Sequence, residues 1–360
     1  MRAHRFMIWT AAVLAPLVSP TFGAAQSAEF AYGDVVEVAP NVQMVIGRDI
    51  NLAKREIDVA SALLYRSGST LVVVDTGGTA EFAEFLDNAA ERLGPYDEVV
   101  LISTHGHADH VGNNAWIDSL GVPARHFISA QDLTAMRDQV SYFATSLGRL
   151  FAQNIVDLFG GLDVEAKNLT VLESLPLETI TIGGTSWIGW SLLDGDVLVL
   201  KTSGHTAGHV IVYLKAPKLL HLGDETTSWY QAFSDGTAAG PANNLLTLTR
   251  AANAVKSGSV DVMTDGHSFK IHRGDEAAEF LDNLIGGTVA FDAAVTRTLN
   301  DNPGGISVPD LVAQVVAAPE LADVPGGPTN PYNFLQMANK LREMGLARPV
   351  NPTAPIAFPE

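Results

Sequence analysis

The 360-residue sequence contains no cysteine, which excludes disulfide bonds and metal sites with thiolate ligands. It also lacks long repeats and low-complexity tracts, while 47% of its residues are hydrophobic and only 17% are charged. This composition is typical of a globular protein rather than a disordered one. The chain must therefore take its stability from a hydrophobic core and from any metal that it binds.

Basic residues are scarce in this chain. It has 22 Lys and Arg against 40 Asp and Glu, which gives a formal net charge of −18. Because such an excess of negative charge repels a phosphate backbone, nucleic acid is not an expected partner. The composition leaves open whether the chain forms a homodimer.

The N-terminal apolar run, FMIWTAAVLAPLV, falls short of the ~20 residues that a transmembrane helix needs. Arg2 and Arg5 precede it and the small residues GAAQSA follow it, which is the order of a secretory signal peptide. We predict that residues 1–28 are removed after Ala25 or Ala28, leaving a periplasmic or secreted protein without an integral membrane segment. Removal takes away two basic residues and no acidic one, so the net charge becomes −20. A buried N-terminal helix or an uncleaved anchor is the alternative.

Apolar runs of strand length alternate with helical patterns along the chain. The expected strands lie at 42–47, 69–78, 98–104, 197–204, 210–215, 218–225 and 260–266. The expected helices lie at 79–93, 111–120, 131–159, 242–256 and 274–299. This alternation predicts an α/β or α+β fold in which helices cover the faces of a sheet.

The sequence pattern changes after about residue 302, where DNPGG is typical of a linker. Short helical patterns follow, SVPDLVAQVV and YNFLQMANKLREMGLARPV, separated by the break GGPTNP. We therefore predict a main domain over 29–300, a small helical appendage over 305–350 and a tail at 351–360.

Three histidines and one aspartate crowd into THGHADH, directly after the expected strand 98–104. A lone histidine is more often a structural residue than a ligand, but imidazole and carboxylate groups in this density favour a site for zinc or a similar divalent ion. One loop cannot complete such a site. His205 in TSGHTAGH, Asp224 in HLGDET and His267 in TDGHS offer further ligands, each after a strand and beside a glycine.

These motifs, in this order after VVVDTGG, resemble those of the metallo-β-lactamase superfamily over about residues 35–275. The resemblance implies an αββα sandwich with two divalent metal ions at one edge, zinc being the first expectation and iron or manganese the alternatives. It assigns His105, His107 and His205 to the first metal, Asp109, His110 and His267 to the second, and Asp224 to a bridge between them. Asp75 matches the strand-end aspartate of the family, usually a structural residue beside the ligands.

Two positions depart from the family pattern, which often has proline where this chain has Ser203 and Ala207. Neither is a ligand. Among the remaining histidines, His209 is expected beside the ligands or in packing and His221 buried on a strand. His126 and His272 carry no signal. The appendage resembles the winged-helix units of some members and is expected to pack on the core or on a partner subunit.

A metal pair of this kind implies hydrolysis. Zinc-bound water has a pKa near ~7 instead of about 15.7, so hydroxide is available at neutral pH, and a second metal stabilises an oxyanion. The resemblance gives Asp109 the additional role of orienting the water. The substrate would be a small molecule with an ester, lactone, amide, sulfate ester or phosphate ester bond.

Ester or lactone hydrolysis is the first expectation, because members with a bridging carboxylate include lactonases, thioesterases and phosphotriesterases. The alternatives are a β-lactamase, a family that generally does not use such a carboxylate, a sulfate or phosphate ester hydrolase, and an iron-dependent oxidoreductase of the same fold. A complete second ligand set argues against the oxidoreductase. A non-catalytic protein with a decayed site is disfavoured because all seven ligand positions are filled.

Two apolar segments are candidates for substrate contact. SWYQAF follows Asp224, and there Tyr230 could donate a hydrogen bond to the substrate while Trp229 walls an apolar pocket. The helical pattern 131–159 widens from a single stripe into a broader apolar surface, which predicts a lid with Phe143 and Phe151 facing an apolar substrate. For both segments the alternative is packing alone.

Overall fold

The computed structural model describes residues 30–51, 54–141, 153, 156–227, 240–322, 324, 340–341 and 344–346. The expected signal peptide at 1–28 and the tail at 351–360 lie outside these residues. No described helix is both long enough and apolar enough to cross a membrane.

Two seven-stranded sheets form the centre of the described fold, each with its strands in chain order. The first sheet contains β1 (Val35–Ala39), β2 (Val42–Val45), β3 (Ala62–Ser67), β4 (Thr70–Val74), β5 (Glu98–Ile102), β6 (Ala124–Ile128) and β7 (Leu169–Val171). The second contains β8 (Glu178–Ile182), β9 (Thr185–Leu192), β10 (Val197–Lys201), β11 (Val210–Leu214), β12 (Leu219–His221), β13 (Val262–Thr264) and β14 (His272–Arg273). The longer helices are α2 (Ala80–Leu93), α7 (Gly240–Lys256), α8 (Gly274–Asp301) and α9 (Val308–Val316), and the shorter ones are α3 (Ala108–Val111) and α4 (Leu133–Arg137).

The central strands are apolar on both faces because each sheet is covered on both sides. In β4, Val72 points into the core between the sheets, whereas its neighbour Val73 packs in the core that also holds Phe82 of α2. In β10, Val199 points into the core between the sheets, whereas Leu200 lies in the core that is shared with α7 and α8. The layers are therefore helix, sheet, sheet and helix, which is the αββα sandwich that the resemblance implied.

The direction of the strands determines where the site lies. β4, β5 and β6 run parallel to one another in the first sheet. In the second sheet β10 and β12 are each antiparallel to β11, and β13 is parallel to β12, so β10, β12 and β13 share one direction. Loops that follow parallel strands gather at one edge of their sheet, and the loops after β5, β10, β12 and β13 carry the motif residues.

Some expected elements differ in the structure. The helix expected at 111–120 is the short α3 followed by a 3-10 helix at Asn114–Ser119. The helix expected at 131–159 is interrupted, because α4 ends at Arg137 and the next residue, Asp138, has a φ of −135° and a ψ of 71°, which are not helical. Seven strands were not predicted: β1, β3, β6, β7, β8, β9 and β14. In β6 and β9, for example, ARHFI and TSWIGWSL mix polar residues or glycine with the apolar ones.

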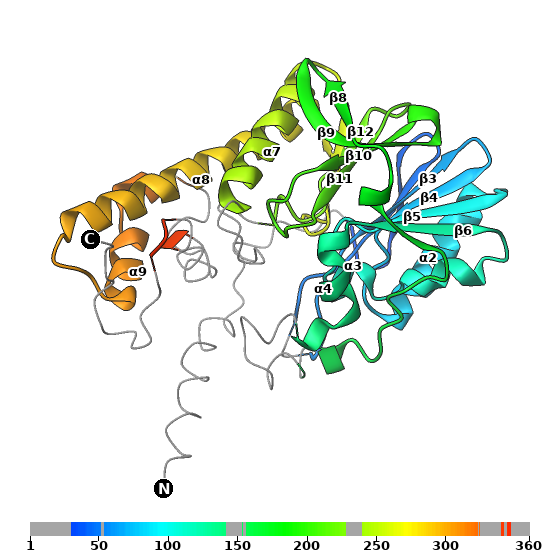
Figure 1. Ribbon diagram of the computed structural model, residues 1–360, viewed down its shortest axis with the longest axis horizontal. Coiled ribbons are helices and arrows are strands. Elements are labelled where there is room, and N and C mark those ends of the chain that lie inside the picture. Colours follow the sequence, from blue (N-terminus) through cyan, green and yellow to red (C-terminus); the bar gives the residue numbers. More distant parts are fainter. Residues whose placement is uncertain are drawn as a thin grey trace, which may run out of the picture.

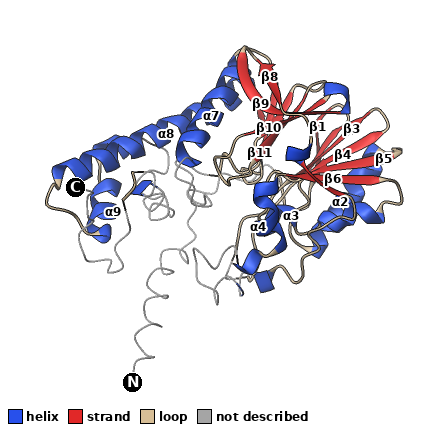
Figure 2. Ribbon diagram, viewed as in Figure 1, coloured by secondary structure: helices blue, strands red, loops and turns tan. Residues whose placement is uncertain are grey.

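The long helix α8 extends away from the sheets and carries α9 at its far end (Figure 1). Figure 2 shows the strands gathered on the other side of the molecule. Helix α9 matches the short helix expected in the appendage; the Ser307 side chain caps it by accepting a hydrogen bond from the Asp310 backbone N–H. Leu311 and Val315 of α9 and Phe291 and Val295 of α8 are all fully buried in one core cluster. The described part of the appendage therefore packs against α8 in this cluster.

Candidate metal centre

All seven predicted ligands lie together at the strand edge of the sandwich. The chain leaves β5 at Ile102 and passes His105 and His107 in a loop that bends at Thr104 and His105, and α3 then turns Asp109 and His110 toward the same centre. The other three ligands follow strand ends, His205 after β10, Asp224 after β12 and His267 after β13. Together they form two groups of side chains whose ligand atoms are close enough to hold metal ions.

The first group consists of His105, His107, His205 and Asp224, all of them buried. His205 Nε2 lies 3.1 Å from His107 Nδ1 and 3.4 Å from Asp224 Oδ2. His105 Nε2 lies 3.9 Å from the same carboxylate oxygen. Three imidazole nitrogens and one carboxylate oxygen therefore face a common point.

The second group consists of Asp109, His110 and His267. His267 Nε2 lies 3.3 Å from His110 Nε2 and 3.2 Å from Asp109 Oδ2. Asp224 also reaches this group, with its other oxygen, Oδ1, 2.9 Å from His110 Nε2 and 3.3 Å from His267 Nε2. One oxygen of Asp224 thus faces each group, which is the arrangement that a bridging carboxylate requires.

These spacings fit a metal ion. Four ligand atoms at 2.0–2.1 Å around a tetrahedral zinc ion lie about 3.3 Å from one another, close to the separations within both groups. The hydrogen bonds also leave the correct ring nitrogens available. Thr104 Oγ1 donates to Asp75, so it accepts from His105 Nδ1, and the buried Nε2 of His105 has no hydrogen-bond partner among the described residues. That nitrogen presents a lone pair to the first group.

Asp75 holds two of the ligands in place through hydrogen bonds. It stands at the end of β4 with a φ of 60°, and its carboxylate accepts hydrogen bonds from the backbone N–H and the hydroxyl of Thr104, at 2.8 and 2.7 Å. Asp75 Oδ2 also lies 2.8 Å from His110 Nδ1. A carboxylate in this position fixes the ring orientation and tautomer of a ligating histidine. Asp75 therefore contacts the ligands without being one, as the resemblance implied.

Two buried carboxylates that sequence reasoning missed hold the loop of His205. Asp132 accepts from Thr206 Oγ1 at 2.7 Å and from the Gly208 backbone N–H at 3.2 Å. On the other side, Glu225 accepts from the Gly204 backbone N–H at 3.1 Å. Asp132 follows β6, whose sequence carries no motif, so nothing in the sequence indicated a role for it. Glu225, in contrast, is the neighbour of Asp224 within the motif HLGDET.

His209 connects this loop to the bridging carboxylate. Its Nδ1 lies 3.2 Å from Glu225 Oε1, and its Nε2 accepts a hydrogen bond from the Asp224 backbone N–H at 3.1 Å. His209 therefore positions a ligand through the backbone, in agreement with the role expected from the sequence. His221 is buried on β12, also as expected.

Ser203 departs from the family pattern for a structural reason. Its φ is 56°, a left-handed conformation that proline, with φ fixed near −65°, cannot adopt. Gly266 meets a different constraint, since a Cβ there would lie 2.7 Å from Asp224 Oδ1 and 2.9 Å from His110 Cε1. Residue 266 must be glycine if the two groups are to keep these positions.

The charges in the centre suit a cation. Burial lowers the pKa of His105 well below its usual range, and burial together with His205 lowers the pKa of His107 to about 3. Burial also opposes charge on His110, but Asp224 and other carboxylates outweigh it and raise its pKa. Burial opposes charge on Asp224 as well, yet the surrounding histidines, His110 first, hold its pKa well below the usual value. Asp224 therefore carries a negative charge between the two groups.

The expected substrate residues Phe143, Phe151, Trp229 and Tyr230 lie outside the described residues. Five other members of the apolar pattern at 131–159 are described: Leu133, Met136, Val140, Leu158 and Phe159. Two of these five are buried in the protein. Met136 is fully buried against Val111 and Ile128. Phe159 is buried in the core that also holds Phe82. These two positions are therefore scaffold, and the lid prediction now depends on the residues between them.

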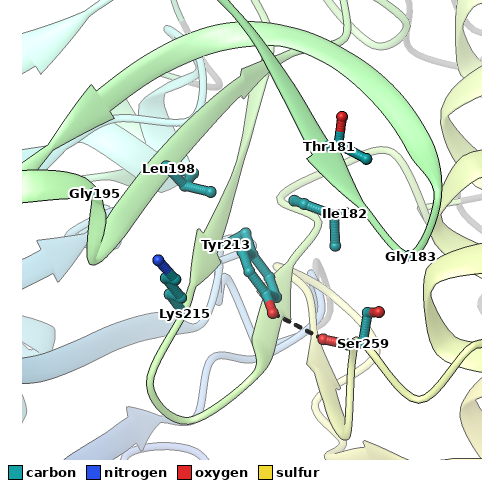
Figure 3. Close-up of a pocket in the computed structure, with 8 residues that line it drawn as sticks. All are labelled: Thr181, Ile182, Gly183, Gly195, Leu198, Tyr213, Lys215 and Ser259. Atoms are coloured by element: carbon teal, nitrogen blue, oxygen red, sulfur yellow. Dashed lines mark hydrogen bonds between the residues drawn. The ribbon is translucent and has the colours of Figure 1, made fainter.

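A separate hollow of about 330 Å³ lies away from the metal ligands along the second sheet (Figure 3). Leu198 at the start of β10 and Lys215 after the end of β11 line it, whereas His205 follows the opposite end of β10. The Tyr213 hydroxyl donates a hydrogen bond to the Ser259 carbonyl within this hollow. It contains no group of metal ligands among its lining residues and is not part of the metal centre.

The motif set, the two sheets and the two ligand groups agree with a comparison to known families. The model of the metallo-beta-lactamase superfamily matches residues 56–267, which is more than half of the chain. The chain belongs to the metallo-β-lactamase superfamily. Members of this superfamily are metal-dependent hydrolases, and so is this protein. It acts on a small-molecule substrate.

Solved structures share the fold at low sequence identity. A metallo-beta-lactamase family protein from Thermus thermophilus matches with a TM-score of 0.57 and 19% identity, over 89% of this chain and 99% of that one. A beta-lactamase domain protein from Burkholderia ambifaria matches with a TM-score of 0.56 and 20% identity, over 92% and 94%. The stereoselective inverting sec-alkylsulfatase Pisa1 from Pseudomonas sp. matches with a TM-score of 0.55 and 18% identity, over 86% and 50%. A search of curated proteins finds no significant match.

Proposed function

We propose that this superfamily member is an exported hydrolase with two metal ions, most simply zinc, that cleaves an ester or lactone bond in an apolar substrate. The observation that carries the proposal is the carboxylate of Asp224, which presents Oδ2 to His205 and Oδ1 to His110. A single metal ion would need only one of these two oxygens. The chain supplies a full set of ligands on each side of this carboxylate.

Substrate would approach from the side of Asp109 and His267. Their side chains keep 16% and 12% of their surface exposed, against 0–5% for His105, His110 and Asp224. Bound divalent ions would act there as Lewis acids and would lower the pKa of a bound water. Asp109, the most exposed of these carboxylates, is placed to orient that water and to accept its proton.

The apolar preference rests on the two segments singled out in the sequence. Phe143 and Phe151 would contribute side chains to a hydrophobic pocket, Trp229 would wall it, and Tyr230 would donate a hydrogen bond to the substrate. Replacing Phe143 or Phe151 singly by Ala tests this part. The kcat/KM for long-chain esters or lactones should fall, and that for short-chain substrates should not; equal losses would assign the segment to the scaffold.

Export rests on the order of Arg2, Arg5, the apolar run and the small residues in 1–28. Mass spectrometry of the protein recovered from the periplasm or the medium should find a chain that begins after Ala25 or Ala28. Soluble cytoplasmic protein with Met1 intact would contradict export and would leave the hydrolase proposal unaffected.

The reaction is tested by elemental analysis together with a substrate panel. Purified protein should contain close to two metal ions per chain, and turnover should be highest on a lactone or an aryl ester. The competing classes in the panel are a phosphotriester, a sulfate ester and a β-lactam. Highest turnover on one of these would replace the proposed substrate, and full activity in metal-free protein would refute the mechanism.

A further inference from the structure

The histidines of the metal centre differ in what supports their second ring nitrogen. Nδ1 of His110 faces the carboxylate of Asp75, and Nδ1 of His105 faces the hydroxyl of Thr104. His267 receives its support from a residue that no motif marks. Its Nδ1 lies 3.4 Å from Oδ1 of Asp58.

Asp58 Oδ1 is buried and has no hydrogen-bond partner within the described residues other than this close approach to His267. The side chain as a whole keeps 36% of its surface exposed, so its second oxygen is available to water. A buried carboxylate oxygen is costly unless it accepts a hydrogen bond. The Nδ1–H of His267 is the donor that this oxygen faces.

Backbone hydrogen bonds tie the segment around Asp58 to the two loops that carry Asp109 and His267. The Ala60 N–H donates to the Asp109 carbonyl at 3.2 Å, and the Ser61 N–H donates to the Gly266 carbonyl at 2.8 Å. Val59 also exchanges two backbone hydrogen bonds of 2.9 Å with Arg48. Because this segment is bonded directly to the backbone of one metal ligand, Asp109, and to Gly266 next to another, His267, the distance from Asp58 to His267 is built into the fold.

We propose that Asp58 is a positioning residue for the second metal position. It holds His267 with Nδ1 protonated, so that Nε2 keeps its lone pair toward Asp109 and Asp224, from which it lies 3.2 and 3.3 Å. Asp58 thus does for His267 what Asp75 does for His110. This role rests on the proposed pair of metal ions. The test below distinguishes a failure of the Asp58 role from a failure of the metal pair.

The experiment compares Asp58→Ala and Asp58→Asn with Glu56→Gln, which removes one negative charge from the same loop two residues earlier. Metal content and the affinity of each ion are measured by titration against a chelator. A carboxylate that orients a ligating histidine is worth about 10–100-fold in metal affinity. Asp58→Ala should weaken the second ion by this factor and leave the first unchanged, Asp58→Asn should restore part of the affinity, and Glu56→Gln should behave as wild type.

A readout that does not depend on activity is the NMR spectrum of the ¹⁵N-histidine-labelled protein. The Nδ1–H signal of His267 should be protected from exchange with solvent in the wild type and lost in Asp58→Ala. Wild-type affinity for both ions in Asp58→Ala, or equal weakening of both together with a lower Tm, would overturn the positioning role while leaving the metal pair in place. A wild-type protein that binds one ion only would overturn the metal pair itself, and this inference with it.

Discussion

The carboxylate of Asp75 lies 2.8 Å from Nδ1 of His110, and neither side chain is exposed to solvent. The same carboxylate holds the loop of His105 through the backbone and the hydroxyl of Thr104. A single residue at the end of β4 therefore supports a ligand in each of the two groups. Its left-handed backbone, with a φ of 60°, is the kind of strained conformation that is found at functional sites.

Replacing Asp75 by Asn should reduce metal affinity about 10–100-fold, because the amide cannot supply the charge that fixes His110. The matched control is Asp196→Asn, since Asp196 accepts two hydrogen bonds, from Tyr65 and Ser67, at the opposite end of β10 from the ligands. Each variant should lose about 1.5–3 kcal/mol of unfolding free energy with its charged hydrogen bonds. Only Asp75→Asn should lose metal in chelator titrations, and equal metal retention in both variants would refute the assignment.

Replacing Asp224 by Ala should weaken both metal positions, because its two oxygens face different groups. The second position loses one of its two carboxylates, so its affinity should fall by more than about 100-fold, beyond the loss typical of an outer residue. Elemental analysis after dialysis measures the effect. The control carboxylate is Asp118→Ala, since Asp118 accepts a hydrogen bond from the Lys167 backbone N–H and belongs to neither ligand group. Unchanged metal content and turnover in Asp224→Ala would count against bridging.

The sequence pattern predicted an α/β or α+β fold and candidate ligands after strand ends, and the family resemblance implied the αββα layers and the gathering of the seven ligands. Apolar runs such as 98–104 end where the motifs begin. Loops that follow parallel strands lie at the same edge of their sheet, so motifs at these strand ends come close together. The ends of β10, β12 and β13 then bring His205, Asp224 and His267 together, as the resemblance implied.

The residues behind the ligands could not be predicted in the same way. Asp58 and Asp132 act through long-range contacts, with partners 209 and 74 positions away in the sequence. Each sits in a segment with no pattern of its own, so its role is visible only once the fold brings the partners together. The interruption of the expected helix at Asp138 could not be predicted either, because the apolar stripe in the sequence continues past this residue, whose backbone angles are not helical.

Replacing Asp132 by Ala should loosen the loop that carries His205. Two hydrogen bonds to that loop, from Thr206 and Gly208, lose their buried acceptor, which costs about 1–3 kcal/mol of unfolding free energy for each unpaired group. Glu173→Gln is the control, because Glu173 supports Ser129 and Ala130 of the same turn without touching the loop. Both variants should lower the Tm, and only Asp132→Ala should also weaken the first metal ion. An equal effect on metal affinity would show that the turn, not the loop, is responsible.

His126 should make the stability of the fold depend on pH. Burial on β6 lowers the pKa of His126 to about 4, whereas the unfolded residue titrates near 6.5. Stability is therefore complete above pH 6.5 and falls as the pH drops toward 4, because the unfolded chain takes up a proton that the folded chain does not. The full difference corresponds to about 3 kcal/mol. Urea unfolding at pH 7, 6 and 5 should show a smaller pH dependence for His126→Gln than for the wild type, and parallel curves would contradict the assignment.

Replacing Gly266 by Ala should damage the metal centre without unfolding the protein. The backbone at this position lies outside the left-handed region, so alanine is sterically allowed by the chain itself, but its Cβ would stand 2.7 Å from Asp224 Oδ1. Either the bridging carboxylate or the loop must move, and we expect metal affinity and kcat/KM to fall at least about 10-fold, as for loss of an orienting residue.

The control is Gly286→Ala in α8, where a Cβ meets no atom within 4 Å. Alanine in a helix interior is favoured over glycine by roughly 0.5–1 kcal/mol, so this variant should be slightly more stable and fully active. If Gly266→Ala kept wild-type metal content and activity, the close approach of residue 266 to Asp224 would not be a constraint on the site. If it lost metal while its unfolding free energy stayed within about 1 kcal/mol of wild type, the narrow space between the two ligand groups would be established as the reason for glycine at this position.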